Sequence, residues 1–205
     1  MQRYLTEGEE RKLFATINSR SGIIARRDYH WMRLARNTGL RVGTLHGLSV
    51  SDARDALASG YLAIRPEISK RKQAHKLFLN KVATASLKAL LKVRRDMLAA
   101  RSEMPAGDAD HCGEPLIISR HGRALSVRSF QHQMRLWCRE TGLPVAASPH
   151  WWRHTLAMRI MRHSTAQDPR GTVMSVLGHR SMNSTAQYTG PSREDVEAAL
   201  REVSA

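Results

Sequence analysis

One segment in the C-terminal half of the chain gathers the side chains best suited to chemistry on a phosphate group. They are His150, Arg153, His154, His179, Arg180 and Tyr188. Clustered guanidinium and imidazole groups repel a metal dication but attract a phosphate, and a guanidinium binds two phosphate oxygens in a planar fork. A histidine exchanges a proton near neutral pH, and a tyrosine hydroxyl can act as a nucleophile. The residue types therefore indicate chemistry on a phosphate.

A helix is predicted to carry the first part of this segment. Pro149 suits the first turn of a helix, and Ser148 before it can cap the N-terminus. On a helix from Pro149 to about His163, His150 and Arg153 lie three residues apart and share a face. His154 lies one position further round, so it faces either the site or the packing beneath it.

Two plainer interpretations compete with a phosphate site. The first is a surface helix with scattered basic residues, which is the usual explanation of a single Arg and His pair. The second is a zinc site built from His150 and His154 at i and i+4. Arg153 between them, and the lack of a helical glutamate, argue against zinc.

The composition points to a polyanionic partner. The 205 residues include 33 Lys and Arg against 18 Asp and Glu, which gives a net charge of +15. Such a surplus favours nucleic acid, with an anionic membrane surface as the rival. The aromatic content of 5% does not favour a base-stacking platform for single strands.

The compartment predicted from the sequence is the cytoplasm. No stretch approaches the ~18 apolar residues of a spanning helix, and the N-terminus resembles no signal peptide. Cys112 and Cys138 lack the spacing of metal ligands, so they are expected to be free thiols in a reducing compartment. No metal site is expected.

The hydrophobic periodicity predicts a mainly helical chain with a small sheet, folded as a single domain over residues 1–205. Helices are expected at 6–18, 24–37, 42–48, 81–100, 126–141, 149–163, 169–177 and 192–203. Strands are expected at 61–64, 76–79 and 116–119. The first two strands form a hairpin with a cationic tip at 69–73, for which a simple solvated turn is the alternative.

Three motifs in this order resemble the catalytic domain of the tyrosine recombinase (phage integrase) family, including its Xer-type members. The first is Thr-Gly-Leu-Arg, ending at Arg41. The second is Ser-Pro-His-Trp-Trp-Arg-His-Thr, at 148–155. The third is Leu-Gly-His-Arg at 177–180, followed by Tyr188. The resemblance covers the chain from about Leu5 to Thr189.

The resemblance implies a role for each matching residue. Arg41, Arg153 and His179 stand at the positions of the family's phosphate-binding arginines and later histidine. Tyr188 matches the nucleophile. His150 matches the histidine that opens the His-x-x-Arg pair and is the candidate proton acceptor.

The hairpin supplies the catalytic lysine in this family. Counting back from Leu79, where the family's strand ends, selects Lys70, with Lys72 as the alternative. The lysine would protonate the departing 5′ oxygen. Arg71, Lys72 and Arg180 are expected to bind DNA.

The implied reaction is cleavage of a phosphodiester by tyrosine, leaving a 3′-phosphotyrosine that a second strand's 5′ hydroxyl can reverse. It requires no ATP, no metal and no cofactor. The implied partners are double-stranded DNA and further copies of the chain, since the family exchanges strands with four protomers. The helix at 192–203 would pack either on a neighbour or on its own domain.

Three departures from the family pattern stand out. Thr44 replaces the usual Glu, and Trp152 replaces the usual Leu. The family usually has an N-terminal helical domain that clamps the other face of DNA, whereas here only a few residues precede the catalytic domain. An accessory protein that supplies the clamp is therefore an expected partner.

The leading hypothesis is a site-specific DNA recombinase or integrase encoded by a bacterium, a phage or a plasmid. One alternative is a non-catalytic DNA-binding or regulatory module derived from an integrase. Another is an enzyme that nicks and reseals DNA without exchange, as type IB topoisomerases do.

Overall fold

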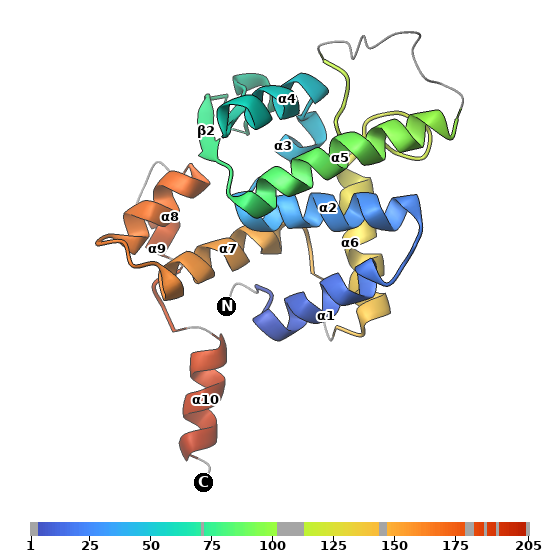
Figure 1. The fold of residues 1–205 in the computed structure, drawn as a ribbon. Coiled ribbons are helices and arrows are strands. Elements are labelled where there is room, and N and C mark those ends of the chain that lie inside the picture. The colour runs from blue at the N-terminus through green and yellow to red at the C-terminus, as the bar shows by residue number, and fades with distance from the viewer. Residues whose placement is uncertain are drawn as a thin grey trace.

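The fold is mainly helical, and a small hairpin lies at its edge beside α4 (Figure 1). The computed structural model describes residues 4–70, 72–101, 113–143, 147–178, 183–186, 188–191 and 193–203. The elements in chain order are α1 (Glu7–Asn18), α2 (Ile23–Thr38), α3 (Val42–Gly47), α4 (Val50–Ser59), β1 (Tyr61–Ile64), the 3-10 turn η1 (Pro66–Ile68), β2 (His75–Phe78), α5 (Lys81–Ala99), α6 (Val127–Thr141), α7 (His150–His163), α8 (Pro169–Leu177), α9 (Asn183–Ala186) and α10 (Arg193–Val203). The predicted mainly helical class with a small sheet is confirmed.

Local capping signals explain where the first helices begin and end. The Thr6 hydroxyl accepts from the Glu9 amide, and the Glu9 carboxylate accepts from the Thr6 amide, which forms the predicted capping box of α1. Gly39 ends α2 in the left-handed conformation, with φ of 64°. Both predicted boundaries are confirmed.

Helix α4 was not predicted from the sequence. Ser49 caps this helix by accepting from the Asp52 amide, and Asp52 accepts from the Ser49 amide in return. The Ser-x-x-Asp pattern was therefore readable in the sequence. Gly60 ends α4 at φ of 77° and turns the chain directly into β1.

The sheet consists of the predicted hairpin. β1 and β2 are antiparallel, with Tyr61 opposite Phe78 and Ile64 opposite His75. The third predicted strand, at 116–119, is wrong. Its residues form only an isolated bridge between Ile118 and Ala124, because their amides and carbonyls pair with loops on both sides.

A buried carboxylate fixes α2 against α6. Asp28 is fully buried, and the indole N–H groups of Trp31 and Trp137 donate to its two oxygens at 3.0 and 2.9 Å. The buried guanidinium of Arg27 neutralises it from the same helix at 2.8 Å. Removing one partner of a buried charge pair typically costs about 3–5 kcal/mol, so this network is a strong constraint on the core.

The predicted C-terminal helix is present as α10, although Ser192, its expected cap, lies outside the described residues. Figure 1 shows α10 extending away from the body of the fold. Leu200 is 63% exposed and Val203 is 87% exposed. Among all described helices, none is long and apolar enough to cross a membrane.

Candidate active site

A cleft between α3, the hairpin and the start of α7 brings some of the predicted site residues together. Its volume is about 720 Å³. The polar residues that line it are Arg41, Thr44, His46, Glu67, Ser69, Lys70, Lys72 and His150. Four of these were predicted as catalytic or DNA-binding, and they come from three separate parts of the sequence.

The end of α2 places Arg41 at this cleft. A Cβ on Gly39 would meet Leu177 at 2.6 Å and Leu156 at 3.1 Å, and the residue has positive φ. Glycine avoids both the strain of a positive φ and these close contacts, so it suits a turn this close to α7 and α8. Arg41 follows two residues later, at the N-cap position of α3.

Arg153 lies behind Arg41 and is buried, with 4% exposure. Its guanidinium donates to the carbonyl oxygen of Gly39 at 2.8 Å and also to the carbonyl oxygen of Leu177. A second cavity of about 210 Å³, the back cavity, is lined by both arginines, His75 and Leu177 among others. Arg153 thus joins the three sequence motifs through the backbone.

His150 occupies the first position of α7 and faces the cleft. Burial lowers the pKa of its imidazole, and the positive charges of Arg153, Arg41 and Lys70 lower it further. The neutral imidazole is therefore favoured at neutral pH, as a proton acceptor requires.

The predicted cap of α7 is wrong. The Ser148 side chain makes no cap hydrogen bond, and Pro149 takes the N-cap position in a right-handed helical conformation. The first turn is closed instead by the Trp151 amide, which donates to the Ser148 carbonyl at 2.9 Å.

Tyr188 is withdrawn from the cleft. It is 4% exposed and lines neither of the two cavities. Its hydroxyl lies 2.9 Å from Nδ1 of His154. Burial raises the pKa of the phenol, while the charges of Arg153 and Arg41 act in the opposite direction. The two arginines are therefore close enough for their field to reach Tyr188.

The sequence did not decide whether His154 faces the site or the packing beneath α7. The structure shows the direction of its side chain. It is buried, and its imidazole contacts Tyr188 rather than the cleft. Its ring also meets the ring of His150 edge to face, with centroids 4.5 Å apart. The spacing of residues along α7 cannot predict this contact, because Tyr188 lies on a segment that is distant in the sequence.

The two candidate lysines differ in their contacts. Lys70 lines the cleft and contributes to the lowered pKa of His150. Lys72 also lines the cleft, but its ammonium donates to the Glu67 carbonyl at 3.4 Å, and its backbone has φ of 53°.

Three predicted residues lie outside the described part of the chain, namely Arg71, His179 and Arg180. The structure does show where the third motif begins. Gly178 ends α8 at φ of 60°, beneath the ring of His75.

The two residues that depart from the family pattern, Thr44 and Trp152, have structural partners. Thr44 donates to the Ile68 carbonyl at 3.2 Å, which joins α3 to η1 below the hairpin tip. Trp152 is fully buried and stacks on Phe14 of α1, with ring centroids 5.3 Å apart. Each residue thus positions an element that borders the site.

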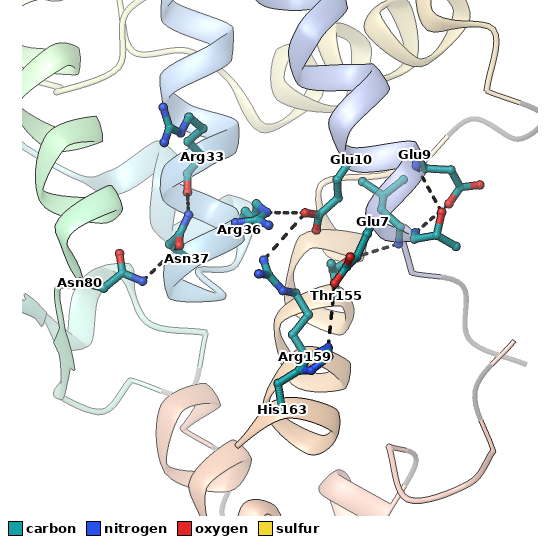
Figure 2. Close-up of polar contacts among 12 residues, drawn as sticks. Glu7, Glu9, Glu10, Arg33, Arg36, Asn37, Asn80, Thr155, Arg159 and His163 are labelled. Atoms are coloured by element: carbon teal, nitrogen blue, oxygen red, sulfur yellow. Dashed lines mark hydrogen bonds and ion pairs between the residues drawn. The ribbon is translucent and has the colours of Figure 1, made fainter. Parts of the chain in front are cut away.

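Polar contacts hold α1 against α7 (Figure 2). Glu10 is buried between two arginines, with Arg36 at 2.5 Å and Arg159 at 3.8 Å. Ahead of α1, the Leu5 amide donates to the Thr155 hydroxyl at 3.0 Å. These contacts fix the orientation of the helix that carries His150, Arg153 and His154.

The fold and these motifs define a known class of protein. Residues 3–194 match the sequence profile of the phage integrase family, so the chain belongs to this family. The tyrosine recombinase XerC of Shewanella amazonensis is 33% identical over 166 residues, which are 81% of this chain and 49% of that protein. XerC of Neisseria meningitidis serogroup B is 30% identical over 166 residues, covering 81% and 48%. The chain spans about half the length of the curated relatives it matches.

Solved structures support the same fold assignment. The crystal structure of XerA recombinase superposes with a TM-score of 0.70 at 23% identity, covering 98% of this chain and 65% of that one. XerH recombinase bound to its difH substrate gives 0.65 at 20% identity, covering 97% and 53%. A lambda integrase dimer bound to a core site gives 0.61 at 22% identity, covering 91% and 47%. The fold is that of a tyrosine recombinase catalytic domain.

Proposed function

We propose that this chain is the catalytic part of a site-specific DNA recombinase or integrase that cuts and rejoins strands through a 3′-phosphotyrosine. The observation that carries the proposal is the cleft itself. It gathers Arg41, Lys70 and His150, with Arg153 behind it and Tyr188 within reach of the arginines' field. The names of the XerC relatives, and the DNA bound in the XerH and lambda integrase structures, support the same reaction class.

In the proposed reaction, the phenolic oxygen of Tyr188 attacks the phosphorus of a backbone phosphodiester. The bond from phosphorus to the 5′ oxygen breaks, and the 3′ side remains bonded to the tyrosine. Arg41 and Arg153 neutralise the non-bridging oxygens, and His179 adds a hydrogen bond. His150 takes the phenolic proton, and Lys70 gives a proton to the leaving 5′ oxygen.

No step uses ATP or a metal, because the phosphotyrosine keeps the energy of the original ester. A 5′ hydroxyl from the same strand reverses the step, and one from another strand completes the exchange. We favour Lys70 over Lys72 as the acid because its charge acts on His150, whereas Lys72 contacts the Glu67 carbonyl.

The nucleophile must change position during this reaction. Tyr188 lines neither cavity, and its hydroxyl contacts His154, so it cannot reach a phosphate held in the cleft without moving. Gly190 and Pro191 follow Tyr188 and interrupt the chain before α10. They leave the segment that bears the nucleophile free to move relative to that helix.

The proposed partner is double-stranded DNA, with Arg71, Lys72 and Arg180 among the residues that contact its backbone. The proposed active assembly is a homotetramer on two paired sites. Leu200 and Val203 of α10 are exposed, which supports packing of this helix on a neighbouring protomer. A clamp for the opposite face of the DNA would come from another protein domain.

The direct test is a suicide duplex that carries a nick near the cleavage position, so that the released fragment diffuses away. The expected result is a covalent protein–DNA adduct that survives denaturation without added metal. Absence of the adduct on the duplex bound most tightly would favour a non-catalytic module. Recovery of recombinant junctions from two duplexes separates strand exchange from simple nicking and resealing.

A further inference from the structure

The contact between Tyr188 and His154 joins the proposed nucleophile to a residue that has no role in the reaction scheme. The hydroxyl oxygen lies 2.9 Å from Nδ1, and both side chains are buried, with 4% and 6% exposure. The two rings are tilted, with centroids 5.5 Å apart. This geometry suits a hydrogen bond at the edge of the imidazole.

The surroundings of Tyr188 are those of a docking site for the ring. Its phenyl group packs in a small apolar cluster with Met158 of α7, Val173 and Leu177 of α8, and Tyr4 from the N-terminal segment. The hydroxyl of a tyrosine in such a cluster needs a polar partner, because an unpaired buried hydroxyl is costly. His154 provides that partner.

His154 connects this docking site with the cleft. Its ring meets His150 edge to face at a centroid distance of 4.5 Å and an interplanar angle of 87°. His150 lines the cleft, whereas Tyr188 does not. The phenol therefore lies one imidazole away from the cleft, on the inner side of α7.

We propose that His154 is a positioning residue that holds Tyr188 in a resting state, and that this hydrogen bond breaks when the tyrosine moves into the cleft. The proposal rests on the proposed function. In the resting state, the phenolic O–H donates to Nδ1, and the imidazole is neutral with its proton on Nε2. After release, the phenol meets the field of Arg41 and Arg153 at the bound phosphate.

We call the hydrogen bond between His154 and Tyr188 the latch. The strength of one hydrogen bond is suited to this role. A neutral hydrogen bond typically changes an equilibrium by about fivefold, which bound DNA can readily overcome. The latch therefore lowers stray cleavage without blocking the reaction. A purely structural histidine differs from a latch in a measurable way, because a ring of similar size without an acceptor would still keep Tyr188 buried.

The first test needs neither DNA nor activity. The free protein is treated with tetranitromethane, and nitration of each tyrosine is followed by mass spectrometry. Tyr61, which is 51% exposed, is the reactive reference, and Tyr4, which is 7% exposed, is the protected one. In the wild-type protein, Tyr188 should be protected as Tyr4 is.

Two variants then distinguish the effect of the hydrogen-bond acceptor of His154 from the effect of its ring. His154→Phe keeps a ring but removes the acceptor, and it should raise nitration of Tyr188 at least fivefold relative to Tyr61 while Tyr4 stays protected. His154→Asn places an amide oxygen near the position of Nδ1 and should retain the protection. If His154→Phe melts less cooperatively than the wild type, His154→Leu replaces it. Unchanged protection in both acceptor-free variants would overturn the proposal.

The second test measures the rate of adduct formation on the suicide duplex under single-turnover conditions. His154→Phe should form the adduct about fivefold faster than the wild type, and His154→Asn should match the wild type. A slower rate in both variants would overturn the latch, because His154 would then assist the chemistry itself. If the wild-type protein forms no adduct, the proposed function fails, and the nitration test still decides the resting contact.

Discussion

Arg153 donates a hydrogen bond of 2.8 Å to the carbonyl oxygen of Gly39, two residues before Arg41. A second N–H of the same guanidinium donates to the carbonyl of Leu177, at the end of α8. One side chain therefore holds together the end of α2, which leads into Arg41, and the end of α8, where the third motif begins. A lysine has no planar fork with which to span these two carbonyls.

Arg153→Lys should therefore fail to replace Arg153. We expect the rate of adduct formation to fall at least about 100-fold, as it does when one preorganised donor is removed from a transition state. Arg159→Lys is the matched control, since Arg159 lies on the same helix and pairs with Glu10 away from the cleft. Cleavage by Arg153→Lys at the rate of this control would contradict the bidentate role.

Tyr188→Phe should abolish the covalent adduct and leave duplex affinity within about twofold of wild type. The phenolic oxygen is required for the bond to phosphorus, but it contributes no charge to binding. Adduct formation is read on denaturing gels and affinity by fluorescence anisotropy. Tyr61→Phe is the matched control, and an adduct that persists in Tyr188→Phe would assign the nucleophile to another residue.

The pH dependence of cleavage should reflect a lowered pKa of His150. The neutral imidazole is the proposed proton acceptor, so the cleavage rate should rise as pH increases through a midpoint below the ordinary value of 6.5 and then level off. The folded state binds fewer protons at this site than the unfolded state between that midpoint and 6.5. The contribution of His150 to stability is therefore present above 6.5 and decreases as the pH falls through this window. A midpoint above 6.5 in single-turnover rates, or the same acid limb in His150→Gln, would rule out this assignment.

Duplex binding should weaken steeply with salt. A chain with a net charge of +15 that contacts ~6 phosphates should give a log–log slope of roughly −5. The measurement is anisotropy over a range of potassium chloride concentrations with a fixed duplex. A flat response, or tighter binding to single strands than to duplex, would point to a different partner.

Deletion of residues from Ser192 onward should disrupt oligomerisation on paired DNA sites more than it disrupts the fold. The apolar side chains of Leu200 and Val203 are exposed, and Figure 1 shows α10 apart from the body of the fold. Calorimetry should therefore find a cooperative transition near the wild-type temperature. Loss of that transition in the truncated protein would show that the helix belongs to its own core.

Local signals in the sequence predicted most helices because caps and periodicity act over a few residues. The capping box at Thr6 and the C-terminal glycine of α2, Gly39, are examples, and both form as predicted. The same logic would have found α4 from Ser49 and Asp52. The strand at 116–119 was wrong because its apolar residues are buried without a partner strand to extend it.

The arrangement of the site depended on contacts that no local signal encodes. The two indoles that share Asp28 come from residues more than one hundred positions apart, and they set how α2 meets α6. The direction of His154 depends on Tyr188, a residue on a separate segment. Motifs select the candidate site residues, but they do not predict which of these residues are buried or which groups they contact.

Three consecutive residues of α7 contact four different parts of the chain. Arg153 contacts the ends of α2 and α8, His154 contacts Tyr188, and Thr155 contacts Leu5 in the N-terminal segment. Consecutive helical residues point about 100° apart, so these three side chains reach in different directions from one stretch of α7. A small rotation of α7 about its own axis would therefore displace the ends of α2 and α8, Tyr188 and the N-terminal segment together.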